Sequence, residues 1–161
     1  MTRCNPLRIT SSRVFPRRLH FRMDVAHGLA SRAFSDNVFV EFRSESGRSG
    51  YGECVPRPYV TGETPEGARA AIPAIAAGFE GRVFESPGDI AAVLGDDCAA
   101  DPIRTDPAAF CAVELALLDL AGRHWDIPAS VIMGLERSRG PLVYSLVAPL
   151  MSDGEIGRAH V

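Results

Sequence analysis

The sequence of 161 residues contains no lysine, so its 17 basic side chains other than histidine are all arginines. This absence excludes a phosphate-binding loop of the Gly-x-x-x-x-Gly-Lys kind. Residues 1–60 hold ten arginines against five acidic residues, and the remainder holds seven against fifteen. A basic front half favours an anionic small molecule, although arginines on solvated strand faces give the same pattern. Nothing gathers the arginines on one helix or alternates them with stacking aromatic residues, so nucleic acid is not an expected partner.

Long apolar runs are also missing. No stretch reaches the roughly 18 to 20 apolar residues that a membrane-spanning helix needs. The N-terminus, MTRCNPLRITSSRVF, has arginines but lacks the apolar core of an export signal. The four cysteines are widely spaced without a Cys-x-x-Cys pair, which is typical of free, mostly buried thiols in a cytosolic protein. We therefore expect a cytoplasmic protein that binds no membrane.

The sequence has little recognisable catalytic machinery. It contains neither a His-Glu-x-x-His nor a Gly-x-Ser-x-Gly motif. The glycines of GRSGYG lie in a predicted hairpin instead of between a strand and a helix, which excludes a dinucleotide-binding fingerprint. No histidine stands at metal-ligand spacing, and a surface or core position is predicted for each: His20, His27, His124 and His160. We expect the chain to supply no catalytic residue and no metal ligand.

The first part of the chain reads as an antiparallel meander of three strands. Residues 7–23 form an extended segment interrupted by Pro16, and the small and polar residues that follow, AHGLASRAFSDN, predict a mobile loop. Residues 37–43 are the clearest strand, because Val38, Val40 and Phe42 share one face. SESGRSG is a turn, and GYGECV returns as the partner strand.

The second part reads as a bundle of three to four helices. A capping residue directly precedes a proline three times, at Thr64-Pro65, Ser86-Pro87 and Asp106-Pro107. These starts predict helices over about 65–79, 87–95 and 107–124. The third is apolar nearly all round and must be buried on most sides, with an ion pair expected between Asp119 and Arg123. IPASVIMGL then predicts a short helical turn, and LVYSLVAPL predicts a strand covered on both faces, as in a barrel.

The connection from residue 56 to residue 63, PRPYVTGE, is unusual because two prolines stiffen an arginine and a tyrosine. Together, GYGECVPRPYVTGET and AVELALLDLAGR resemble the N-terminal capping domain of the enolase superfamily, in its mandelate racemase and muconate lactonizing enzyme group. The resemblance covers about residues 7–150. It implies an α+β fold: a three-stranded meander, the helix bundle, and the first strand of a (β/α) barrel that is otherwise missing.

In that family two loops of the cap close on the substrate and set its specificity. Here they correspond to residues 27–37 and 56–63, so the resemblance implies six substrate-binding residues: His27, Arg32, Arg57, Tyr59, Val60 and Thr61. An apolar lid of this kind excludes water from the chemistry. In the alternative interpretation Tyr59 packs against the first helix and Arg57 points to solvent.

The family's reaction begins with abstraction of a proton α to a carboxylate, and Mg²⁺ stabilises the enediolate anion that this step forms. A barrel takes roughly 250 residues, far more than follow the cap here. The resemblance therefore implies a cap over 1–137 and the start of a truncated barrel over 138–155. Residues 156–161 resemble a sequencing adapter and are expected to be a non-native tail; the alternative is a genuine C-terminus. The fragment alone is then inactive and binds no Mg²⁺. The complete enzyme, commonly a homo-oligomer, is a cycloisomerase, racemase or epimerase, or dehydratase of a carboxylate substrate. The alternative is a free-standing, non-enzymatic cap-like domain that binds a small ligand or a protein.

Overall fold

The computed structural model describes residues 5–27, 30–97, 105–135, 140–141 and 143 of the chain. The chain divides into two compact units. The first contains residues up to Arg17 and residues 36–137, and the second contains residues 18–35 and the chain from Ser138 onward. Most of the predicted apolar strand LVYSLVAPL lies outside the described residues, so its expected place in a barrel stays a prediction.

Four strands form one sheet in the order β3-β2-β1-β4. Their bounds are β1 Leu7–His27, β2 Ala30–Ser44, β3 Ser49–Cys54 and β4 Val83–Phe84. β2 and β3 are antiparallel, with Val38 opposite Cys54 and Arg43 opposite Ser49, and β4 pairs antiparallel with the start of β1. The three-stranded meander is therefore confirmed. The additional strand β4 has only two residues, too few to show an alternating pattern in the sequence.

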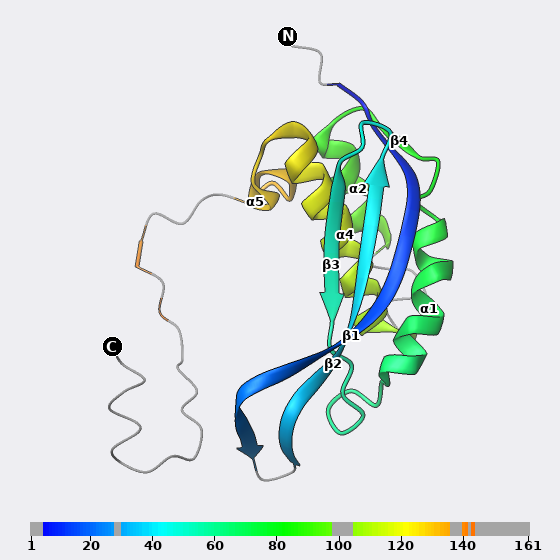
Figure 1. The fold of residues 1–161 in the computed structure, drawn as a ribbon. Coiled ribbons are helices and arrows are strands. Elements are labelled where there is room, and N and C mark those ends of the chain that lie inside the picture. Colours follow the sequence, from blue (N-terminus) through cyan, green and yellow to red (C-terminus); the bar gives the residue numbers. More distant parts are fainter. Residues whose placement is uncertain (1–4, 28–29, 98–104, 136–139, 142, 144–161) are drawn as a thin grey trace. The chain divides into compact units, whose positions relative to one another are not determined.

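Four helices follow within the described part of the chain: α1 Pro65–Ala77, α2 Pro87–Asp97, α4 Pro107–Trp125 and the short α5 Ala129–Ile132. The longer ones begin at the three prolines that the sequence places at a first helical position. Figure 1 shows α1, α2 and α4 gathered on one face of the sheet, which confirms the α+β class.

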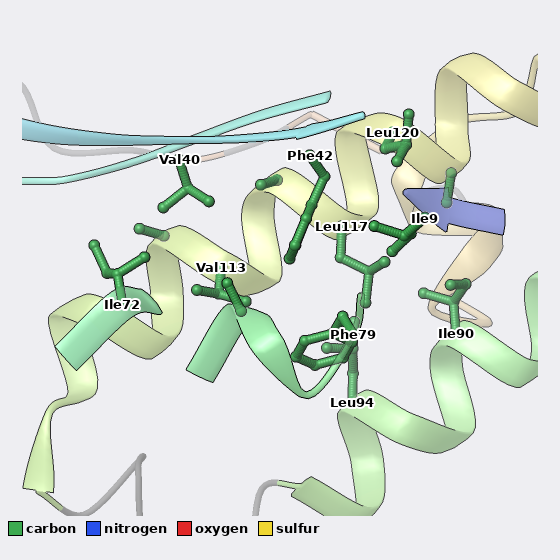
Figure 2. Close-up of a cluster of buried hydrophobic side chains, with 14 of the residues drawn as sticks. Ile9, Val40, Phe42, Ile72, Phe79, Ile90, Leu94, Val113, Leu117 and Leu120 are labelled. Atoms are coloured by element: carbon green, nitrogen blue, oxygen red, sulfur yellow. The ribbon is translucent and has the colours of Figure 1, made fainter. Parts of the chain in front are cut away.

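The core lies between that face of the sheet and α4. Val38, Val40 and Phe42 of β2 are completely buried, as their alternation predicts. α4 contributes eight buried side chains, which confirms that this helix is covered on most sides. Figure 2 shows Val113, Leu117 and Leu120 of α4 in the same cluster as Ile72, Phe79, Ile90 and Leu94.

The two glycines of the GYGE sequence allow β3 to lie directly against α4. A Cβ atom added to Gly50 would stand 2.2 Å from the backbone nitrogen of Leu120, and one added to Gly52 would stand 1.8 Å from the carbonyl oxygen of Ala112. Both positions are buried, and backbone atoms cannot move aside as a side chain can. These glycines thus set the distance between the sheet and its main helix.

Two expectations for the strands were wrong. The segment predicted as a mobile loop is β-structure, because β1 ends at His27 and β2 begins at Ala30. Cross-strand contacts stabilise it in spite of its small residues: the Arg18 guanidinium lies 3.9 Å from the centre of the Phe34 ring, on which His20 also packs edge-on. β1 also continues through Pro16, which lies where β1 is not paired with the short β4 and therefore loses no ladder hydrogen bond on that side.

The three predicted helix caps differ in how they work. Thr64 caps α1 as expected, since its hydroxyl accepts a hydrogen bond from the Gly67 N–H at 3.0 Å. At α2 the carboxylate of Asp89 reaches back to the N–H groups of Glu85 and Ser86. Asp106 occupies the N-cap position of α4, but its side chain makes no capping hydrogen bond, so that expectation was wrong.

Candidate functional site

Residues Arg57 to Gly62, called the Arg57–Gly62 turn below, form one closed helical turn. The N–H groups of Val60 and Thr61 both donate to the Arg57 carbonyl oxygen, at 2.9 and 3.0 Å, and the Gly62 N–H donates to the Pro58 carbonyl at 3.1 Å. Gly62 has φ 79°, the left-handed conformation in which glycine commonly ends a helical turn. The two prolines predict a rigid connection, and the structure forms an ordered, hydrogen-bonded turn there.

Both ends of this turn are fixed to the core. On the entry side, Cys54 and Pro56 are buried. On the exit side, Glu63 and Thr64 are consecutive residues that bind the N-termini of two different helices. The Ala108 N–H of α4 donates to Glu63 Oε1 at 2.8 Å, and Thr64 caps α1. Glu63 thus supplies the cap that Asp106 does not.

Four of the six predicted substrate-binding residues meet on this turn. Arg57 and Thr61 are exposed, and Tyr59 and Val60 have exposed fractions of 37% and 64%. The turn therefore presents a cation, an aromatic ring and an aliphatic side chain side by side, carried on backbone that is anchored at both ends. Their contact with a substrate stays a prediction.

His27 and Arg32 belong to the second unit. His27 is the last residue of β1, and its side chain lies outside what the structure describes. Arg32 lies in β2, half-buried and engaged in contacts of its own. His27 ends one strand and Arg32 lies near the start of the next, so both belong to strands instead of the predicted flexible loop.

One buried acid was not singled out from the sequence. Glu41 of β2 lies on the sheet face opposite the helices, yet it is only 5% exposed. Its carboxylate accepts hydrogen bonds from Ser49 Oγ at 2.8 Å and Tyr51 Oη at 3.1 Å, and it pairs with Arg13 at 2.8 Å and Arg43 at 3.4 Å. The Ser49 bond and these other partners, against the opposing effect of burial, lower the pKa of Glu41.

An open cavity of about 320 Å³ adjoins this cluster and is lined by Ser11, Ser12, Arg13, Glu41 and Arg43. The hydrogen bonds and ion pairs of Glu41 described above all join it to residues of β1, β2 and β3. The cluster is therefore best explained as a structural link between the strands. In the sequence, Glu41 stands between the apolar residues Val40 and Phe42. This alternation is usual for a strand with one solvated face, so it does not indicate a buried acid.

One ion pair links α4 to β3. Asp119 and Arg123 form the predicted ion pair at 2.9 Å, and Asp119 also accepts a hydrogen bond from the Tyr51 N–H. Cys54 and Cys111 are free thiols, the first buried and the second exposed. Among the described residues, no group of three or more histidine, cysteine, aspartate or glutamate side chains is placed to hold a metal ion. The described residues thus do not fit a Mg²⁺ site.

Several large apolar side chains are exposed on β3, on α4 and around α5. Tyr51 of β3 and Leu115 of α4 are 45% and 44% exposed and line the same open cavity of about 510 Å³. Val131 and Leu135, on and just after α5, are 56% and 64% exposed.

In the part of the chain that the structure describes, no helix is long and apolar enough to cross a membrane.

No protein-family model matches the chain. The curated aromatic dipeptide epimerase of Herpetosiphon aurantiacus is 35% identical to it over 104 residues, which are 65% of this chain and 28% of that protein. The L-Lys-D/L-Arg epimerase of Methylococcus capsulatus is 31% identical over 118 residues, which are 71% of this chain and 32% of that protein. The chain thus spans about a third or less of the length of these curated relatives.

Solved structures that resemble this chain include proteins from the same two organisms. The dipeptide epimerase of Methylococcus capsulatus, crystallised with Mg and the dipeptide L-Arg-D-Lys, superposes with a TM-score of 0.73 at 27% identity, over 95% of this chain and 42% of that one. A mandelate racemase/muconate lactonizing protein of Herpetosiphon aurantiacus gives 0.60 at 30% identity, over 73% and 32%.

The sheet, the helices on one of its faces and the anchored turn define an α+β domain of the enolase N-terminal type. The chain belongs to the enolase superfamily, within its mandelate racemase and muconate lactonizing enzyme group.

Proposed function

We propose that this chain is the capping domain of a Mg²⁺-dependent dipeptide epimerase and that the Arg57–Gly62 turn contacts the substrate. The observation that carries the proposal is the turn itself: exposed side chains of three chemical kinds on backbone anchored to α1 and α4. The curated relatives are epimerases of aromatic, hydrophobic or cationic dipeptides, which supports this reaction over cycloisomerisation or dehydration.

The cap's contribution to such a reaction is binding and exclusion of water. Mg²⁺ would be held by residues outside those described and would stabilise the anion formed when the α-proton leaves. A turn that is already ordered loses little conformational entropy on closing over the substrate. The side chains of Tyr59 and Val60 would cover the dipeptide and keep water from the reacting carbon.

The chemistry of the turn favours apolar or aromatic dipeptides. Tyr59 and Val60 gain from burial against an apolar substrate side chain, by about 25 cal/mol for each Å² of apolar surface covered. Arg57 on the same turn would repel a lysine or arginine side chain placed against it. We therefore propose a substrate preference nearer to the aromatic and hydrophobic dipeptide epimerases than to the L-Lys-D/L-Arg epimerase.

A free-standing, non-enzymatic domain is the weaker candidate. Tyr51 and Leu115 are partly exposed and line one open cavity beside the edge strand β3, and Val131 and Leu135 expose more than half of their surface on and just after α5. Uncovered surface of this kind promotes association. A chain that is monomeric, cooperatively folded and unable to bind a hydrophobic dye would favour the free-standing interpretation.

The test is a chimera in which residues 5–135 replace the matching region of the Methylococcus capsulatus dipeptide epimerase. Exchange of the dipeptide α-proton in D₂O, followed by ¹H NMR with Mg²⁺ present, reports activity. We expect the ratio of kcat/KM for apolar over cationic dipeptides to rise at least about tenfold above that of the parent enzyme, and Arg57→Glu to reverse part of the change. A folded chimera with the parent's preference, unaffected by Arg57→Glu, would contradict the proposal.

A further inference from the structure

The N-terminus of α4 has an incomplete cap of its own. Asp106 makes no side-chain capping bond, and Pro107 at the first helical position has no N–H. Ala108 is then the first residue of the helix with an N–H that needs an acceptor. The acceptor is Glu63, 45 residues earlier in the chain, at 2.8 Å in a partly buried position. The carboxylate also lies at the positive end of the helix, where negative charge is favoured.

The Arg57–Gly62 turn is fixed mainly at its two ends, although Tyr59 also makes a contact of its own. Its three internal hydrogen bonds fix its shape, but Arg57, Pro58, Tyr59, Val60, Thr61 and Gly62 are all exposed. One isolated helical turn is unstable in water, because the first turn orders several residues for few hydrogen bonds. The turn therefore depends on its anchors, and Glu63 is the residue directly after it.

The two anchors on the exit side act on different helices. Thr64 bonds within its own helix α1, of which it is the N-cap. Glu63 bonds across the fold to α4, the helix with the most buried side chains and the main partner of the sheet. Glu63 is thus the side chain that ties the end of the turn to the rigid centre of the domain.

We infer that Glu63 is a positioning residue: its hydrogen bond to the Ala108 N–H holds the Arg57–Gly62 turn in one place relative to α4. This inference goes one step beyond the contact residues and, as far as substrate is concerned, rests on the proposed function. Loss of the bond lets Tyr59 and Val60 move as a unit. Because the turn binds the substrate but does not react with it, KM should rise while kcat changes little.

Amide hydrogen exchange in the 161-residue chain tests the inference without any substrate. Glu63→Ala should speed exchange at the Val60, Thr61 and Gly62 amides about tenfold, as expected for the loss of a charge-assisted hydrogen bond. Glu63→Gln keeps an acceptor for the Ala108 N–H but loses the charge, so its exchange rates should lie between those of the wild type and those of Glu63→Ala. If Glu63→Ala does not fold, Glu63→Asp shortens the side chain by one methylene and allows the same comparison.

Asp89→Ala is the matched control, because the Asp89 carboxylate likewise accepts backbone N–H groups at a helix start, at 2.7 and 3.0 Å, but on α2. It should leave the three turn amides unchanged relative to global unfolding. Equal effects of Glu63→Ala and Asp89→Ala on these amides would overturn the inference. In the chimera, a Glu63→Ala variant with a loosened turn and an unchanged KM would instead count against substrate contact by the turn, so the two failures are distinguishable.

Discussion

Substitution of Gly52 by alanine tests how the sheet is held against its main helix. The added Cβ would lie 1.8 Å from the Ala112 carbonyl oxygen and 2.6 Å from the Ala116 nitrogen. Ordinary contact begins near 3.4 Å. β3 and α4 must therefore separate by about 1.6 Å at this point, the difference between 3.4 and 1.8 Å, which loosens the packing of buried side chains on both elements.

The cost should be large because the obstacle is backbone. Overpacking that side chains can absorb costs about 1–3 kcal/mol, and here the nearest atoms all belong to the backbone of α4. We expect Gly52→Ala to lose more than about 3 kcal/mol of a total that is about 5–15 kcal/mol in domains of this size. The matched control is Gly95→Ala in α2, where nothing lies within 4 Å of the new atom, and a gain of about 0.5–1 kcal/mol is expected.

Urea unfolding, followed by circular dichroism and by the fluorescence of the single tryptophan, Trp125 at the end of α4, measures both variants. Opposite signs are predicted for the same Gly→Ala change. If Gly52→Ala unfolds cooperatively within 1 kcal/mol of the wild type, the close approach of β3 to α4 is not what requires this glycine.

Two further predictions concern titratable groups. The pKa of Glu41 is lowered in the folded state from its ordinary value of 4.5. The contribution of this carboxylate to stability is therefore fully present above that value and is lost as the pH falls through the lower, folded pKa. The difference in unfolding free energy between wild type and Glu41→Gln should shrink between pH 6 and pH 3, and an unchanged difference would refute the role of this carboxylate. Burial raises the pKa of the Cys54 thiol to about 12. Partial burial and the nearby Glu114 also raise the pKa of Cys111, but this thiol is exposed to reagent. At pH 8, iodoacetamide should therefore modify Cys111 slowly in the native chain and Cys54 only in urea, as peptide mapping by mass spectrometry can establish.

The sequence predicts those features that depend on neighbouring residues. Each of the three Xaa-Pro pairs predicts the first residue of a helix correctly, because the proline and the residue before it define the first turn locally, whereas the predicted ends differ by one or two residues. The face shared by Val38, Val40 and Phe42 follows from strand alternation. The helical pattern of the third helix likewise predicts its burial.

Features that depend on distant residues were missed. The hairpin around residues 27–37 is stabilised by contacts such as Arg18 with Phe34, which local composition does not reveal. The cap of α4 comes from a residue far away in the sequence, whereas the local sequence points to Asp106. For the candidate site, the segment 56–63 was found from its prolines and its family resemblance, whereas the anchoring role of Glu63 required the fold.

The central claim, that this chain caps a Mg²⁺-dependent epimerase, is tested most directly by following the source reading frame beyond Leu150 and assaying its product. The account predicts a barrel with paired lysines and acidic metal ligands, and a protein that exchanges the α-proton of an apolar dipeptide in D₂O with Mg²⁺ but not with EDTA. A source frame that stops at Val161, or a full-length folded protein that exchanges no dipeptide proton, would contradict it.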